Sequence, residues 1–276
     1  MIYKITADSA SNVHKLDKID FSNVPLKIIT DVKEYVDDKS LNIVEMIKDL
    51  KSYKGRSSTA CPSIGEWLES FGEADRVFAV TITSNLSGSY AAALEAKKIY
   101  EENNPYKKVC VVDTLSAGGE MQLIVEKIQE FICEGMDFEA ICEKIEEYKK
   151  KTHLVFSLES LKNLANNGRV SHLVAAAAGV LGIRVVGRAS SVGTLEPMHK
   201  VRGEKKAIET LYSEMKNNGF IGGKVCLTHC FNENAAQTLK NIIMKDFPKC
   251  DISVVQMNGL CTFYAEQGGM LIGFEG

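Results

Sequence analysis

The sequence predicts an α/β protein built from two lobes, an N-terminal α/β domain with a parallel sheet (residues 1–151) and a C-terminal α/β domain (152–276). Two observations support this. Apolar runs of strand length at 77–82 and 108–112 are each followed by a polar turn and a long helical stretch, which is the βα unit of a parallel sheet. Near residue 151 the pattern changes, and a second series of strands and helices begins.

The first 151 residues contain four expected strands and five expected helices. Pro62 and Ser63 predict the start of one helix, with the proline just inside the helix and the serine as its cap. Phe138, Ile141 and Ile145 follow helical spacing in the last helix. The strands are expected at 2–7, 24–30, 77–82 and 108–112, and the helices at 43–52, 64–71, 89–103, 121–135 and 137–151.

The remaining residues predict a strand from Leu154, a helix that stops at Gly168 and a hairpin over 183–201. Turn residues Ser190, Ser191 and Gly193 support the hairpin. The small apolar stretch 173–183 suits either close helix packing or space for a ligand. Further elements are expected at 204–217 (helix), 223–228 (strand), 233–246 (helix) and 251–256 (strand).

Composition argues against several classes of protein. The formal net charge is -3, without the basic face that a nucleic-acid binder shows. The N-terminus lacks a signal-peptide apolar region, and no apolar run approaches the ~20 residues of a membrane span. A cytoplasmic protein without stable membrane insertion is therefore expected. Cys226, His229 and Cys230 form only a weak zinc pattern, so reduced core thiols and no metal are expected.

Two hydroxyl-rich segments precede expected helices and form a candidate anion site. In the segment 84–89, Ser87 offers a hydroxyl, Gly88 allows close approach to the backbone, and Ser84 is a further donor. Thr59 and Ser63 lie in the second segment. A helix N-terminus attracts carboxylate or phosphate groups, and loops after parallel strands collect ligand-binding groups. Simple helix capping is the alternative for each segment.

Charged residues supply further candidates. Arg169 could steady a carboxylate, or it is an exposed residue at a helix C-cap. Lys200–Gly203 either docks an acidic partner or forms a charged hairpin end. Asp8 and Asp113 each end a strand and could form a catalytic pair, although Asp turns commonly bond their own backbone. GxSxG, HExxH and Walker A patterns are missing, so no catalytic residue is expected.

Taken in order, these segments resemble the DegV family. The matching segments are Asp8-Ser9, Thr59–Ser63 (similar to Thr-Ser-x-Pro-Ser), Ser84–Tyr90 (similar to Ser-x-Leu-Ser-Gly-Thr-Tyr), Val112–Thr114, Asn167–Ser171 and Lys200–Gly203. They extend over nearly the whole chain. Each is weak alone, and the ordered set is specific.

The resemblance implies a cytoplasmic binding protein, not an enzyme, with no cofactor. One long-chain fatty acid would lie in a cleft between the lobes, and a separate fatty acid kinase would receive it. Thr59, Ser87 and Gly88 would bind the carboxylate, with Ser63, Ser84 and Arg169 as further head-group or entrance residues. The family's C-terminal Thr-His segment is altered here, and Tyr264 or Ala265 stands at the histidine position. A Tyr264 hydroxyl could substitute as donor.

Two alternatives remain open at this level. The first is an enzyme that acts on a small phosphorylated or carboxylated substrate with Asp8 or Asp113 as base, which requires a short, wet site. The second is a diverged interaction module without lipid binding, whose channel Phe263 and Tyr264 would fill. A carrier requires a long, dry channel that starts beside Thr59 and Ser87.

Overall fold

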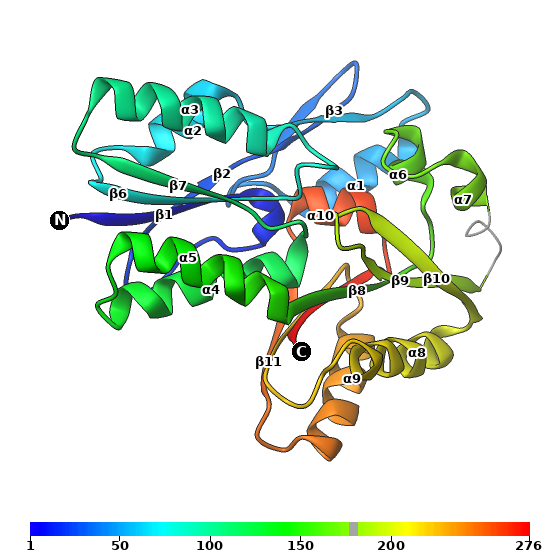
Figure 1. The fold of residues 1–276 in the computed structure, drawn as a ribbon. Coiled ribbons are helices and arrows are strands. Elements are labelled where there is room, and N and C mark those ends of the chain that lie inside the picture. Colours follow the sequence, from blue (N-terminus) through cyan, green and yellow to red (C-terminus); the bar gives the residue numbers. More distant parts are fainter. Residues whose placement is uncertain (177–181) are drawn as a thin grey trace.

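The computed structural model describes residues 1–176 and 182–276, and it shows an α/β protein with a parallel sheet and a mixed sheet. The parallel sheet lies in the N-terminal half, with the strand order β2-β1-β6-β7 (Figure 1). Its strands are β1 (Tyr3–Asp8), β2 (Asp20–Val24), β6 (Arg76–Thr81) and β7 (Lys108–Asp113). All three pairings are parallel, as the βα pattern predicts.

Helices cover both faces of this sheet (Figure 1). On one face, α2 (Ile64–Phe71) and α3 (Ser89–Asn103) bury Trp67 and Phe71 against Val77 and Ala79. On the other, α4 (Gly118–Cys133) and α5 (Phe138–Tyr148) pack with the opposite side chains of the strands, and Phe78 contacts Phe138. Strands buried on both faces explain the continuous apolar runs.

The expected strand at 24–30 is wrong as a single element. Pro25 interrupts it, because proline has no N–H to donate to a sheet. The chain instead forms β2 in the parallel sheet and β3 (Lys27–Ile29) in a small antiparallel sheet, order β4-β3-β5, with β4 (Glu34–Val36) and β5 (Ser58–Ala60). Helix α1 (Ile43–Ser52) places Met46 against Ile28 in the core of this sheet.

The C-terminal half holds a six-stranded mixed sheet in the order β10-β9-β8-β13-β11-β12. Helices α8 (Glu204–Asn217) and α9 (Glu233–Asp246) lie together on one side of it (Figure 1). The strands are β8 (Thr152–Leu158), β9 (Ile183–Ala189), β10 (Leu195–Arg202), β11 (Lys224–His229), β12 (Asp251–Gln256) and β13 (Met270–Glu275). Strands β9 and β10 form the expected hairpin.

The elements not expected from the sequence include two near the C-terminus. Strand β13 lies between β8 and β11 near the centre of the sheet, and α10 (Gly259–Ala265) precedes it. Helix α10 packs on the N-terminal half, because Asp37 accepts hydrogen bonds from Gly259 N and Leu260 N at 2.6 and 2.9 Å. The two halves are therefore joined through the C-terminal segment. The division at residue 151 stays a prediction, although every strand from β8 onward belongs to the mixed sheet.

Helix α4 also joins the halves, because its first turn packs on the backbone of the mixed sheet. A Cβ on Gly119 would lie 2.3 Å from Cys226 O, and one on Gly273 would lie 2.0 Å from Glu120 N. Glycine is therefore required at this contact. Short helices α6 (Lys162–Asn166) and α7 (His172–Ala176) and two 3₁₀ turns (Ser9–Ser11 and Lys149–Lys151) complete the structure. Residues 177–181 of the small apolar stretch 173–183 lie outside the described residues.

Candidate functional site

A cavity of about 320 Å³ is lined by residues from both halves of the chain. The N-terminal half contributes β5 and the loops after β6 and β7. The C-terminal half contributes β8, the segment around Arg169, the β9–β10 turn and α10. The large apolar side chains of the lining are those of Leu26, Ile82, Leu86, Leu115, Leu154, Phe156, Leu158, Leu164, Leu195, Leu260 and Leu271. This volume and lining are typical of a small-molecule site.

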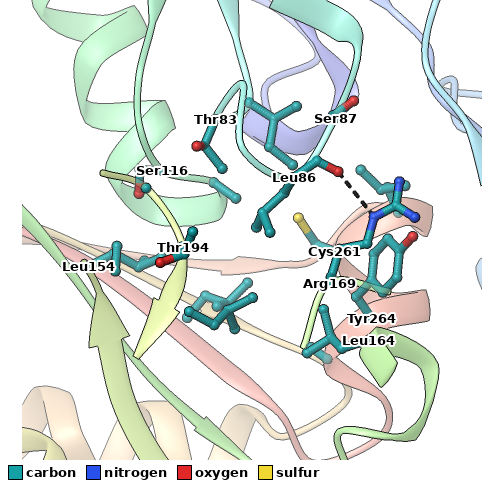
Figure 2. A pocket seen from close by; sticks show the side chains of 18 of the residues that line it. Thr83, Leu86, Ser87, Ser116, Leu154, Leu164, Arg169, Thr194, Cys261 and Tyr264 are labelled. Carbon is teal, nitrogen blue, oxygen red and sulfur yellow. Dashed lines mark hydrogen bonds between the residues drawn. The ribbon is translucent and has the colours of Figure 1, made fainter. Parts of the chain in front are cut away.

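Ser87, Arg169 and Tyr264 lie together at one end of this cavity (Figure 2), and Thr59 lines it beside Tyr264. The hydroxyl oxygens of Thr59 and Tyr264 lie 2.7 Å apart. Arg169 Nε donates to Leu86 O at 3.0 Å, and its Nη1 donates to Asn167 O. Three of these residues were candidates from the sequence, and Tyr264 was a proposed substitute donor. The hydroxyl residues Thr83, Ser116 and Thr194 line the opposite side (Figure 2).

The local sequence explains how Thr59 and Tyr264 come together. Strand β5 pairs with β3 so that Thr59 lies opposite Ile28. Ile28 packs in the same buried cluster as Phe263 of α10. The next residue, Tyr264, packs against the edge of this cluster and also lines the cavity. Phe263 is not among the lining residues, so it does not fill the cavity.

The two hydroxyl-rich segments meet at the start of α3. Gly88 is its N-cap, and a Cβ there would lie 3.1 Å from Cys61 Sγ. Ser87 Oγ accepts a hydrogen bond from Ser89 N at 3.3 Å, which fixes the hydroxyl at the helix start. The partial positive charge of a helix N-terminus favours an anion at this position.

Ser63 and Ser84 are not among the lining residues. Ser63 caps α2: its Oγ accepts from Glu66 N at 3.2 Å, and the Glu66 carboxylate accepts from Ser63 N at 2.7 Å. Pro62 precedes this cap and does not lie inside the helix. Ser84 is exposed, and its N donates to Asp113 Oδ1. Ser63 therefore acts as a helix cap and Ser84 forms part of a turn, which are the alternatives to ligand binding.

Asp8 and Asp113 both lie outside the lining of the cavity. Asp8 is fully buried and accepts hydrogen bonds from Ile82 N at 2.8 Å and Ser89 Oγ at 2.7 Å. Burial raises the pKa of Asp8 to about 7, against the opposing effect of these bonds. Asp113 accepts from Ser84 N and Leu115 N, each at 3.1 Å. Both carboxylates support loops, as aspartates at turns commonly do.

Arg169 is the only charged residue among the described residues that line the cavity. Burial raises the pKa of the Tyr264 hydroxyl, while Thr59 and Arg169 partly oppose this shift. Tyr264 therefore stays protonated and available as a donor near neutral pH. The cavity thus presents a cation and neutral hydroxyls at one end, which suits a carboxylate.

Sequence reasoning missed the contributions of Cys61 and Cys261, which both line the cavity. The sequence could not single out these two cysteines, because a reduced cysteine serves as a small apolar core residue as readily as a cavity-lining one. Within 1–176 and 182–276, no three His, Cys, Asp or Glu side chains are placed to hold a metal ion. No helix of these same ranges is long and apolar enough to cross a membrane.

Comparison with known proteins adds a family and several relatives. The model of a family described as "Uncharacterised protein, DegV family" matches residues 3–275. A DegV domain-containing protein of Streptococcus pneumoniae is 42% identical over 279 residues, covering 100% of this chain and 99% of the relative.

Solved structures resemble this one over nearly the full chain. A DegV family protein from Eubacterium eligens loaded with heptadecanoic acid is 45% identical, with a TM-score of 0.97 and 99% coverage of both chains. The Fatty Acid Kinase (Fak) B3 protein of Streptococcus pneumoniae loaded with linoleic acid is 42% identical, with a TM-score of 0.98 and coverage of 100% of this chain and 99% of that one.

Proposed function

The chain belongs to the DegV family, and from that premise we propose that it binds a single long-chain fatty acid and presents it to a separate fatty acid kinase. The acid would occupy the cavity, which would then be the ligand cleft between the two halves. Two relatives of more than 40% identity are loaded with fatty acids, and one of them is named as a fatty acid kinase B protein. The chain itself would be a binding protein and not a catalyst.

The observation that carries the proposal is the uneven lining of the cavity. Arg169 and the hydroxyls of Thr59, Ser87 and Tyr264 line one end, while the rest is mostly apolar apart from the hydroxyls of Thr83, Ser116 and Thr194. Burying one methylene gains ~0.8 kcal/mol, so a chain of about 14 methylenes gains roughly 11 kcal/mol before ordering costs. The tail therefore supplies most of the affinity, and the polar end orients the carboxylate and prevents an unpaired buried charge.

The head-group assignments follow from position. Thr59, Ser87 and Tyr264 would donate hydrogen bonds, Arg169 would supply the charge, and Gly88 would let the carboxylate approach the start of α3. Gly88 is exposed, and Thr59, Ser87 and Arg169 are only partly buried. The carboxyl group would therefore lie close to the surface, where a kinase can reach it. Ser63 and Ser84 have no part in this proposal.

The two alternatives receive no support from the lining. An enzyme with Asp8 or Asp113 as base requires a carboxylate at the cavity, and neither lines it. A diverged module requires a filled channel, whereas a cavity of about 320 Å³ remains beside Tyr264. No observation favours either alternative over a carrier.

Native mass spectrometry of the chain purified from bacterial cells tests the proposal. We expect one added acyl chain per protein, and fatty acids in the lipid extract. Ser87→Ala should weaken fatty acid binding, while Ser84→Ala is the matched control and should leave it unchanged. A protein that carries no acyl chain and binds none when titrated would overturn the proposal. For the transfer step, we expect a fatty acid kinase to phosphorylate the bound acid and to fail with ligand-free protein.

A further inference from the structure

The turn between β9 and β10 docks on the N-terminal half beside the cavity. Asn85 Nδ2, in the loop after β6, donates to Val192 O at 2.6 Å. The neighbouring Gly193 has a φ of +77°, and a Cβ there would lie 2.2 Å from Thr83 Oγ1 and 2.9 Å from Leu115 O. Only glycine allows this close contact. The turn is thus fixed to loops that line the same cavity.

Strand β8 shows how far this turn lies from the polar end. Leu158, Phe156 and Leu154 alternate along β8, and all three line the cavity. A strand rises ~3.3 Å per residue, so this row is about 13 Å long. Leu154 and Thr194 lie on the opposite side of the cavity from Arg169 and Tyr264 (Figure 2). The β9–β10 turn therefore stands at the far end, where a fatty acid would place its methyl group.

Ala189 lies at this far end of the cavity. Strands β8 and β9 are antiparallel, with Phe156 opposite Gly187 and Val155 opposite Arg188. Continued by one residue, this register places Ala189 beside Leu154. Ala189 lines the cavity, as does Thr194, which is exposed to solvent. Beyond these small residues the tail would leave the protein.

We propose that the β9–β10 turn closes the tail end of the cavity and that Ala189 sets the upper limit of acyl-chain length. This inference rests on the proposed function. With the carboxylate held at Thr59 and Arg169, a longer chain must either press on the turn or extend past Thr194 into water. Chain length would then be selected by the space at Ala189 and by the strength of the Asn85–Val192 contact.

Titration of a series of saturated acids from dodecanoic to eicosanoic acid tests this. Ala189→Leu fills the tail end and should weaken octadecanoic acid binding by about tenfold, with tetradecanoic acid little affected, since roughly two methylenes lose their place. The matched control is Ala60→Leu. Ala60 lines the same cavity beside Thr59, so the same added volume at the head should weaken all lengths by a similar factor.

A second variant acts in the opposite direction. Asn85→Ala removes the bond to Val192 and should improve eicosanoic acid binding roughly threefold relative to tetradecanoic acid. Thermal unfolding confirms that each variant is folded. If Ala189→Leu and Asn85→Ala leave the length profile of the wild type unchanged, or Ala189→Leu weakens every length equally, the length assignment fails and fatty acid binding stands. If the wild type binds no acid of any length, the proposed function itself fails.

Discussion

The hydroxyl of Tyr264 lies 2.7 Å from that of Thr59, although 205 residues separate them in the chain. This contact joins α10 to β5 at the polar end of the cavity. The family resemblance places a histidine at Tyr264 or at Ala265, depending on the register, and both residues line the cavity. Only Tyr264 carries a donor, so it is the residue that can replace the histidine there.

Replacement of Tyr264 by phenylalanine should weaken fatty acid binding by roughly tenfold, because a hydrogen bond to a charged group contributes about 1.5 kcal/mol or more. Isothermal titration with hexadecanoic acid measures this change. Tyr106→Phe is the control, since Tyr106 is 91% exposed. Equal affinity of Tyr264→Phe and wild type would show that Tyr264 does not contact the carboxylate.

Arg169 is expected to supply charge to the carboxylate. Arg169→Met keeps much of the side-chain length but removes the cation, and we expect a loss of affinity of about tenfold or more at low salt, since charge-assisted hydrogen bonds are among the strongest. Arg169→Lys should recover part of the loss. The control Lys15→Met removes an exposed charge. If Arg169→Met binds fatty acid with the same affinity as the wild type, the cation has another role, such as support of the loop at Leu86.

Regular elements of the fold could be predicted closely because their periodicity is local. The helices at 43–52, 89–103 and 233–246 begin and end where the pattern indicates. Strand β13 could not be predicted in the same way, because its place between β8 and β11 depends on pairing with distant segments. Helix α10 is short, and its N-terminus is capped by Asp37 from the other half of the chain.

The candidate site was predictable in type but not in detail. Ser87 lies in the loop after the parallel strand β6 and lines the cavity, whereas Thr59 lines it from β5 of the antiparallel sheet, which the sequence did not predict. Ser63 could have been set aside, because Ser63 and Glu66 have the spacing of a capping box. Tyr264 remained ambiguous with Ala265, since only the packing of α10 decides which side chain reaches Thr59.

Burial of Asp8 makes stability depend on pH. Its pKa is raised to about 7 in the folded protein, so between pH 4 and 7, roughly, the native state binds more protons than the unfolded state. The contribution of Asp8 to stability is therefore greatest at low pH and declines as the pH rises through this window. Asp8→Asn should reduce the loss of unfolding free energy across this pH window by about 1 to 3 kcal/mol.

Urea unfolding between pH 5 and 8, followed by the fluorescence of the buried Trp67, measures this effect. Asp17→Asn is the control, because the Asp17 side chain is 87% exposed. Glu120 is also buried, and its pKa is likewise raised to about 7, so part of the slope should persist in Asp8→Asn. A variant whose slope equals that of the wild type would contradict the assignment to Asp8.

Asp37 should matter for both stability and binding, because its carboxylate holds the first turn of α10, the helix that carries Tyr264. Asp37→Ala leaves two backbone N–H groups without this acceptor and should cost about 2 to 4 kcal/mol of unfolding free energy. Fatty acid affinity should fall with it, since the Thr59–Tyr264 contact depends on the position of α10.

Urea unfolding and titration on the same sample measure the two effects. Asp38→Ala is the control, because the Asp38 carboxylate accepts hydrogen bonds from the N and Oγ of nearby Ser40 in a local turn. A loss of stability with unchanged affinity would show that α10 keeps its place without Asp37 and that the cap serves the fold alone.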